Sequence, residues 1–234
     1  MELKLVPTLY QRVILESLFC GAVLCDLASV VGDVAEFGVW NGESAAVLAL
    51  GIATSEAQYG FVRAKCGLKP RTLHLFESFR GLPKITERSD LDSPHVKAGV
   101  WVEGASTPQQ TSAQIHDAVA THIPRDRIKM HDGWFKDTVP AMAPGTRFAL
   151  LHLDVGLYEA GMDVLGGSFR KGLISEGAQV FLAAWNTNLC SPRHGARRAW
   201  GECVETYGIE FSDSGEYGAI GKKFIVHGYK GMPQ

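Results

Sequence analysis

The spacing of apolar residues separates stretches of helical periodicity from short, almost continuous apolar runs. Helical spacing over residues 7–31 predicts an amphipathic helix near the N-terminus. The same spacing predicts further helices at residues 43–54, 111–123, 158–171 and 195–208. Short apolar runs predict strands at residues 34–40, 72–78, 127–133, 148–154 and 178–184.

The order of these elements indicates the fold class. Strands and helices alternate, and the runs FALLHLD (148–154) and AQVFLAA (178–184) are almost wholly apolar, as expected for parallel strands covered on both faces. Residues 209–228 contain no helical stretch and predict two antiparallel strands at the edge of the sheet. We therefore predict a doubly wound α/β sheet in a single domain that spans residues 1–234.

Residues 80–110 interrupt this alternation. The segment is rich in Pro, Ser, Asp and Gly and lacks the periodicity of either a helix or a strand. Irregular segments this long inside a domain are usually lids or binding loops. We expect residues 80–110 to form a lid or insert beside a ligand site.

Composition and charge narrow the class of protein. A formal charge of −2 gives no electrostatic footprint for nucleic acid or an anionic membrane. No signal-peptide pattern or membrane-spanning run is evident, and the five cysteines form no C-x-x-C pair. These features predict a cytoplasmic globular protein with reduced thiols and with neither nucleic acid nor membrane as a partner. Homo-oligomerisation stays open.

The turn after the first predicted strand, EFGVWNGES, offers a ligand-binding motif. Doubly wound sheets bind ligands beyond the carboxyl ends of their strands, where Gly38 and Gly42 allow close approach to the amides of the next helix. The glycines do not match G-x-G-x-x-G, so a dinucleotide is not indicated, and Glu36 suits a cationic amino group. An ordinary strand-to-helix turn explains these residues equally well.

The next two strands also end in acids. Glu77 stands where an acid commonly binds ribose hydroxyls, although a solvated loop acid would have the same pattern. Asp132, Gly133 and Trp134 offer an acid and an aromatic ring for a purine, with a core tryptophan as the alternative for Trp134. Together the three strand ends suit a nucleoside with a zwitterionic tail, and S-adenosylmethionine fits that description.

Four motifs, EFGVWNGESA, HLFESFRGLP, GWFKDTVP and LLHLDVGLYEAGMDVL, resemble in order and spacing the macrocin O-methyltransferase family, whose members use S-adenosylmethionine to methylate sugar hydroxyls of natural products. The resemblance covers residues 34–226 and implies a class I methyltransferase fold, a seven-stranded sheet with an antiparallel last strand, and an acceptor pocket bordered by residues 79–83. The cofactor-binding residues implied by this motif match are Glu36, Gly38, Trp40, Asn41, Gly42, Ser44, Glu77, Ser78, Asp132, Gly133, Trp134 and Asp154.

The same resemblance implies that the family's magnesium site is missing here. In the family, the fourth strand ends in two acids two positions apart and the fifth in Asp-Asp-Tyr, and these acids bind the metal and supply the general base. This chain keeps Asp154 but has Gly156, Ala183 and Ala184 at the other acidic positions, and we expect Trp185 to fill space that a hydrated ion would need. One carboxylate is a poor site for a hard cation, so we predict no metal and expect Asp154 to face the cofactor or the acceptor.

The base that removes a proton from the acceptor is therefore a separate question. His194 is the first candidate because imidazole titrates near neutral pH, with a solvated loop histidine as the alternative. Tyr158 either contacts the acceptor or begins a helix, and Asp154 itself can act as the base. We expect His152 to be a hydrogen-bonded core residue. The nearby arginines are predicted to be a solvated helix face more than an acidic-acceptor site: Arg193, Arg197 and Arg198.

Three functions follow from these residues. The first is a metal-independent methyltransferase for a small natural-product or sugar-like acceptor. The second is an S-adenosylmethionine-binding enzyme redirected to another group transfer or a cyclisation, and the third is a non-catalytic pseudoenzyme that binds a ligand or a partner. Methyl transfer ranks first because alignment alone can contribute about 7–11 kcal/mol without a base. The pseudoenzyme ranks last because the cofactor motifs are intact.

Overall fold

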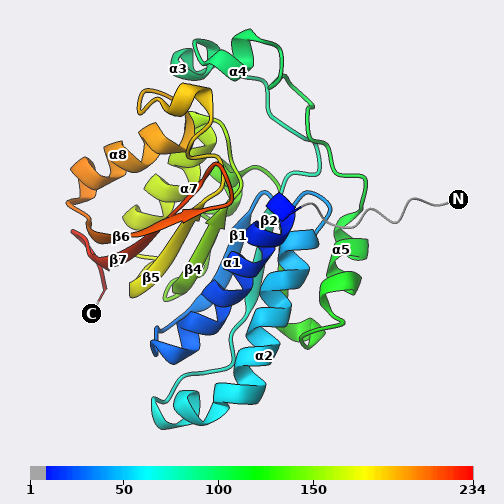
Figure 1. The fold of residues 1–234 in the computed structure, drawn as a ribbon, viewed down its shortest axis with the longest axis vertical. Coiled ribbons are helices and arrows are strands. Elements are labelled where there is room, and N and C mark those ends of the chain that lie inside the picture. Colours follow the sequence, from blue (N-terminus) through cyan, green and yellow to red (C-terminus); the bar gives the residue numbers. More distant parts are fainter. Residues whose placement is uncertain (1–8, 234) are drawn as a thin grey trace, which may run out of the picture.

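A twisted sheet with helices on both faces forms the centre of the molecule (Figure 1). The computed structural model describes residues 9–233, and within them seven strands run in the order β3-β2-β1-β4-β5-β7-β6. The first five strands pair in parallel, β7 is antiparallel to β5, and β6 is antiparallel to β7. The predicted fold class is confirmed. The strands are β1 (Asp33–Phe37), β2 (Leu73–Glu77), β3 (Ile128–Asp132), β4 (Phe148–Leu153), β5 (Ile174–Leu182), β6 (Glu210–Tyr217) and β7 (Gly221–Gly228).

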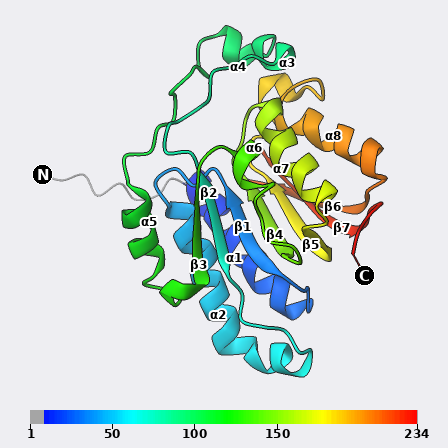
Figure 2. The same ribbon diagram turned by 180° about the vertical axis from the view of Figure 1, so that it is seen from behind.

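Helices cover the two faces of the sheet in two separate core layers (Figures 1 and 2). One layer is formed with α1 (Leu9–Leu27), α2 (Glu43–Lys65) and α5 (Ser112–Val119). The other is formed with α6 (Phe135–Thr138), α7 (Tyr158–Arg170) and α8 (Gly195–Tyr207). Because both faces are covered, every residue of β4 is buried, which explains why its sequence is apolar almost without interruption.

The predicted elements differ from the observed ones mainly at their ends. The N-terminal helix is present from Leu9, and the first two residues of the predicted range lie outside the described part. The helix α2 continues well past the predicted end because Arg63 near its C-terminus is buried and bonds Asp26 at 3.3 Å and Glu56 at 2.9 Å. Among the described helices, α2 alone has the length and apolar composition to cross a membrane, and here one side of it packs in the core.

The segment 80–110 rises over the edge of the sheet where the parallel strands end (Figure 1). It contains two single-turn helices, α3 (Arg88–Leu91) and α4 (Pro94–Lys97), that periodicity did not predict. Two short 3-10 turns, η1 (Arg125–Arg127) and η2 (Asn188–Cys190), complete the chain. We call residues 80–110 the lid segment.

Candidate functional site

The turn between β1 and α2 is held close to the end of β4. Gly38 has φ +85°, and a β-carbon added there would stand 2.7 Å from the carbonyl oxygen of Asp154. The Asp154 amide in turn donates to the Phe37 carbonyl at 2.9 Å. Gly42, with φ +87°, precedes the first turn of α2, in which Ser44 lies. Gly38 therefore lets the ends of β1 and β4 meet beside the N-terminus of α2.

Glu77 holds the ends of β1 and β2 together. One of its carboxylate oxygens accepts the amides of Val39 and Trp40, both at 3.0 Å. The other accepts the amides of Ser78 at 2.8 Å and Phe79 at 3.2 Å. Trp40 and Phe79 both have left-handed backbones, with φ 47° and 59°, a strain that proteins concentrate at functional sites. The predicted contact of Glu77 with a ribose stays a prediction, because in this structure the carboxylate already accepts four amides.

A cavity of about 510 Å³ opens at the ends of β2 and β3. Ser78, Asp132 and Gly133 line it together with the two ends of the lid segment, Arg80 and residues 108–110, so the structure brings three of the predicted cofactor residues to one place. Asp132 accepts a hydrogen bond from the Ser112 hydroxyl at 3.0 Å. Trp134 does not line the cavity and instead precedes the first turn of α6.

Trp40 and Asn41 lie on the rim of the β1 turn. Trp40 is 49% exposed, which leaves its indole available to a ligand. The Asn41 side-chain oxygen accepts the amides of Gln109 at 2.8 Å and Gln110 at 3.3 Å. Asn41 therefore fastens the end of the lid segment to the turn, a role that the motif did not reveal.

Glu36 is placed differently from the expectation that it meets a ligand's ammonium group. Residues alternate across a strand, which puts Glu36 on the α1 side of the sheet, fully buried, in register with His152 of β4. Its carboxylate lies 2.8 Å from His152 Nδ1, and the other carboxylate oxygen and His152 Nε2 have no partner. The prediction of a hydrogen-bonded core histidine at 152 is confirmed. The expected contact of Glu36 with a ligand's amino group stays a prediction, because in this structure the carboxylate is buried against His152.

Asp154 stands at the point where the ends of β1 and β4 meet. Solvent reaches its side chain, yet protein lies around it on most sides. This partial desolvation raises the pKa of the Asp154 carboxyl; His152 opposes the shift, and the nearby Glu77 carboxylate adds to it. A carboxylate with a raised pKa is a stronger base, so Asp154 can accept a proton from a group bound beside it.

The space next to Asp154 is filled by a residue of the lid segment. Trp101 lies over Gly156, where an added β-carbon would stand 2.5 Å from the indole ring. The His95 imidazole stacks on the same indole with ring centroids 4.6 Å apart. The expectation that Trp185 fills this space is wrong, because Trp185 packs against Phe224 on the α8 side of the sheet. Trp101 belongs to the predicted lid, but no sequence pattern pointed to its contact with Gly156, since that contact joins segments far apart in the chain.

The lid segment is fastened to the core by two further polar contacts. Asp90, only 1% exposed, accepts the amides of Tyr158 at 2.7 Å and Glu159 at 3.0 Å and so caps the N-terminus of α7. Burial raises the pKa of Asp90, and those two amides oppose the rise. The buried Asn188 accepts the His95 amide at 3.0 Å. Leu157, the residue before α7, has no side-chain oxygen and cannot cap the helix itself.

The two other catalytic candidates, Tyr158 and His194, form hydrogen bonds within the structure. Tyr158 donates its hydroxyl to Glu202 of α8 at 2.6 Å, and burial, followed by this hydrogen bond, raises the pKa of Tyr158 to about 12. Tyr158 therefore joins α7 to α8, and its contact with the acceptor stays a prediction. His194 Nδ1 lies 3.1 Å from the Ser89 carbonyl oxygen and so contacts the lid segment. Arg198 pairs with Glu202 on its own helix, as expected for a helix face.

The side chains that could bind a metal ion do not gather in the described part of the structure. Within residues 9–233, no group of three or more His, Cys, Asp or Glu side chains could hold a metal ion. Gly156, Ala183 and Ala184 carry no side-chain oxygen, and Trp101 covers the first of them. Asp154 thus lacks the converging carboxylates that a hard cation needs.

Comparison with known proteins identifies the class. The sheet order and its antiparallel end are those of class I methyltransferases. The family model described as macrocin O-methyltransferase matches residues 23–191, and the chain belongs to this family. The solved structure of the O-methyltransferase NovP has a TM-score of 0.70 at 21% identity over 92% of this chain and 79% of that one. The structure of CalS11, a calicheamicin methyltransferase, has a TM-score of 0.68 at 20% identity over 93% of this chain and 80% of that one.

Two curated relatives show how far the sequence similarity extends. Mycinamicin III 3''-O-methyltransferase of Micromonospora griseorubida is 32% identical over 142 residues, which are 61% of this chain and 51% of that protein. The 8-demethyl-8-(2,3-dimethoxy-alpha-L-rhamnosyl)-tetracenomycin-C 4'-O-methyltransferase of Streptomyces olivaceus is 28% identical over 169 residues, 72% of this chain and 58% of that protein. The chain spans about half the length of the curated relatives that it matches.

Proposed function

We propose that the protein transfers the methyl group of S-adenosylmethionine to a small natural-product or sugar-like acceptor. The observation that carries the proposal is the cavity at the ends of β2 and β3, lined by Ser78, Asp132 and Gly133 and adjoining the glycine turn of β1. The family membership supports it, as do the names of the relatives, which are O-methyltransferases of glycosylated natural products.

The residues around the cavity fit this cofactor. A volume of about 510 Å³ is in the range of sites that enclose small ligands. Asp132 and Ser78 offer an acceptor and a donor for the adenosine, and the Gly38 turn with the first amides of α2 suits the carboxylate of the amino-acid end. When bound, S-adenosylmethionine supplies an activated methyl group on a sulfonium centre.

Asp154 is the proposed proton acceptor. It stands next to Gly38, it is accessible to solvent, and desolvation raises the pKa of its carboxyl. A carboxylate oxygen of Asp154 would take the proton of an acceptor hydroxyl held against it. The lid segment would exclude water from this point, because Trp101 already packs over Gly156 and His95 stacks on the Trp101 ring.

The proposed reaction proceeds without a divalent metal. A metal in such a site would bind the acceptor's oxygen atoms and lower the pKa of its hydroxyl. Here one carboxylate, Asp154, stands beside Gly156, and the indole of Trp101 fills the space above that glycine. Alignment of the acceptor hydroxyl with the methyl group therefore supplies most of the rate enhancement.

A transfer assay with labelled cofactor tests this function. Deuteromethyl S-adenosylmethionine is incubated with the protein and a panel of glycosylated macrolides and glycosylated aromatic polyketides, and products are analysed by mass spectrometry. We expect labelled product, and Asp154→Asn should lower its rate by about 10²-fold or more. The matched control is Asp126→Asn on the exposed η1 turn, which should leave the rate unchanged. Equal rates in Asp154→Asn and wild type would refute the role of Asp154.

A further inference from the structure

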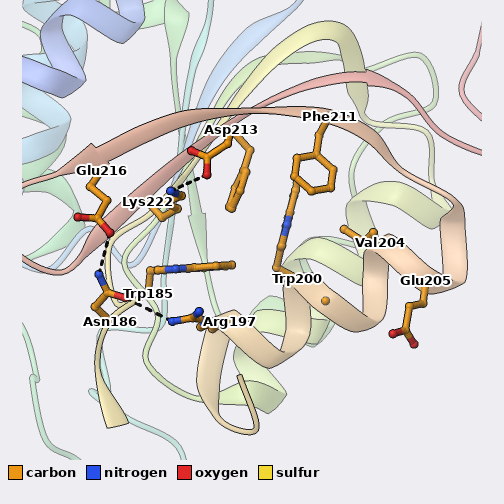
Figure 3. Close-up of a pocket in the computed structure, with 12 residues that line it drawn as sticks. Trp185, Asn186, Arg197, Trp200, Val204, Glu205, Phe211, Asp213, Glu216 and Lys222 are labelled. Atoms are coloured by element: carbon orange, nitrogen blue, oxygen red, sulfur yellow. Dashed lines mark hydrogen bonds and ion pairs between the residues drawn. The ribbon is translucent and has the colours of Figure 1, made fainter. Parts of the chain in front are cut away.

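A second cavity, of about 570 Å³, lies at the opposite edge of the sheet from the β2–β3 cavity, between α8 and the β6–β7 hairpin (Figure 3). Aromatic rings form its inner surface. Trp200 stacks on Phe224 with ring centroids 4.5 Å apart, and Phe211 meets Trp200 edge-on at 5.4 Å. Trp200 and Phe224 are 3% and 4% exposed, whereas Phe211 is 39% exposed, so the floor is packed and the rim is open.

The polar groups of this groove are largely paired with one another. Lys222 bonds Asp213 at 2.7 Å, and the Asn186 amide nitrogen donates to Glu216 at 3.3 Å. Arg197 bonds the Asn186 side-chain oxygen at 3.5 Å and lies over the Trp185 ring, 4.9 Å from its centroid. The groove therefore offers both hydrogen-bond donors and hydrogen-bond acceptors in fixed positions, and the charges of Lys222 and Asp213 compensate each other. Glu205 lies apart from these polar residues (Figure 3).

A glycine keeps the groove open. Gly201 lies in the middle of α8 and lines the cavity, and a β-carbon added there would have no neighbouring atom within 4 Å. Glycine is a poor helix former, so position 201 does not stabilise α8. Its effect is to leave free space beside Trp200 that a side chain would occupy.

We propose that this groove binds a sugar ring of a glycoside. The apolar C–H face of a pyranose stacks on aromatic rings, and its hydroxyls both donate and accept hydrogen bonds. The accessible rings of Phe211 and Trp185, bordered by an amide, a lysine and carboxylates, match both requirements. An ion would meet charges that are already compensated. A wholly apolar ligand would strip water from Lys222 and Asp213 without replacing its hydrogen bonds.

The groove begins near the carboxyl ends of β4 and β5, where Asp154 stands. The Ala183 amide donates to the Leu153 carbonyl at 2.9 Å, which places the end of β5 directly beside the residue before Asp154. Trp185, two residues further, is already a wall of the groove. The role in turnover rests on the proposed function: the groove holds a sugar of the acceptor other than the one that carries the reacting hydroxyl.

Saturation-transfer NMR with simple glycosides tests the groove without any cofactor. The probes are methyl α-L-rhamnopyranoside, methyl β-D-glucopyranoside and 4-nitrophenyl β-D-glucopyranoside at millimolar concentration, with choline as a cationic control. We expect saturation transfer to a glycoside but not to choline. Gly201→Leu should fill the groove and weaken glycoside binding by about tenfold or more. Gly60→Leu is the matched control, because Gly60 is also a glycine of a long helix with open space around it.

The outcomes separate this proposal from the cofactor proposal. Absence of transfer to every glycoside, equal binding in Gly201→Leu and wild type, or transfer to choline in place of the glycosides would overturn the groove. Calorimetry with S-adenosylhomocysteine, run on the same samples, reports on the cofactor cavity at the other edge of the sheet. If calorimetry detects no S-adenosylhomocysteine binding while the glycosides still bind, the proposed cofactor site is overturned and the proposed sugar groove is not.

Discussion

The indole of Trp101 lies against Gly156 so closely that a β-carbon at position 156 would stand 2.5 Å from the ring. One residue belongs to the lid segment and the other follows Asp154 by two positions. The absence of a side chain at 156 is therefore a packing requirement of the lid segment. The two residues should be energetically coupled, because the indole at position 101 fits only when position 156 has no side chain.

Substitution at position 156 should displace the lid segment. Gly156→Ala forces the new methyl group into the indole, and overpacking of this kind costs about 1–3 kcal/mol. Trypsin should then cut faster at the basic residues of segment 80–110. Gly201→Ala, at an open position, is the control and should not change the cleavage rate. Once Trp101→Ala has removed the indole, adding Gly156→Ala should not change the cleavage rate any further. Strict additivity of the two changes would contradict the coupling.

Restoring acids alone should not create a metal site. The triple variant Gly156→Asp, Ala183→Asp, Ala184→Asp places one carboxylate into space that Trp101 occupies. We expect calorimetry to detect tight Mn²⁺ binding only when Trp101→Ala is added to the triple variant, because several oxygen ligands can then converge. Equally tight binding in the triple variant would show that Trp101 does not block the site.

Asp90 should contribute to stability far more than its neighbour Asp92. Asp90 is buried and accepts two amides at the start of α7, so Asp90→Ala leaves both unpaired and should cost about 1–3 kcal/mol in urea unfolding. Asp92 is exposed, and its bond to Lys97 at 3.0 Å is a surface ion pair worth about 0–1 kcal/mol. Equal losses in Asp90→Ala and Asp92→Ala would contradict the cap.

The protein should lose stability as the pH falls from 6.5 to 4. Burial, with His74 and Lys129 acting in the same direction, lowers the pKa of His131 from its ordinary 6.5 to about 4. The folded state binds this proton less readily than the unfolded state, so the stabilisation is present above pH 6.5 and is lost as the pH falls to about 4. His131 lies 3.0 Å from His74, which in turn lies 3.3 Å from Asp33.

Urea unfolding at a series of pH values measures this loss. His131→Gln removes the titrating group and should flatten the dependence between pH 6.5 and 4. His227→Gln, on the exposed part of β7, is the control and should keep the wild-type slope. A slope in His131→Gln equal to that of wild type would assign the acid sensitivity to other groups.

Local patterns predicted the sheet because burial of both faces makes a parallel strand apolar along its whole length, as in Phe148–Leu153. They also predicted Asp132, since strand ends in this fold meet at one edge, whereas Ser78 was implied by the motif match. The contacts that failed prediction join distant segments: Asp90 reaches Tyr158, 68 positions along the chain, and Trp101 reaches Gly156. Local periodicity predicts neither the face of the sheet on which Trp185 packs nor the residue that pairs with the buried Arg63.

Calorimetric titration with S-adenosylhomocysteine in the presence of EDTA tests the cofactor site most directly. We predict saturable binding to the wild-type protein, unchanged when EDTA is replaced by magnesium. Asp132→Ala, at the wall of the cavity, should weaken it by about tenfold, while Asp126→Ala on the exposed η1 turn should not. Absence of binding at millimolar ligand, or binding that requires magnesium, would contradict the proposed site.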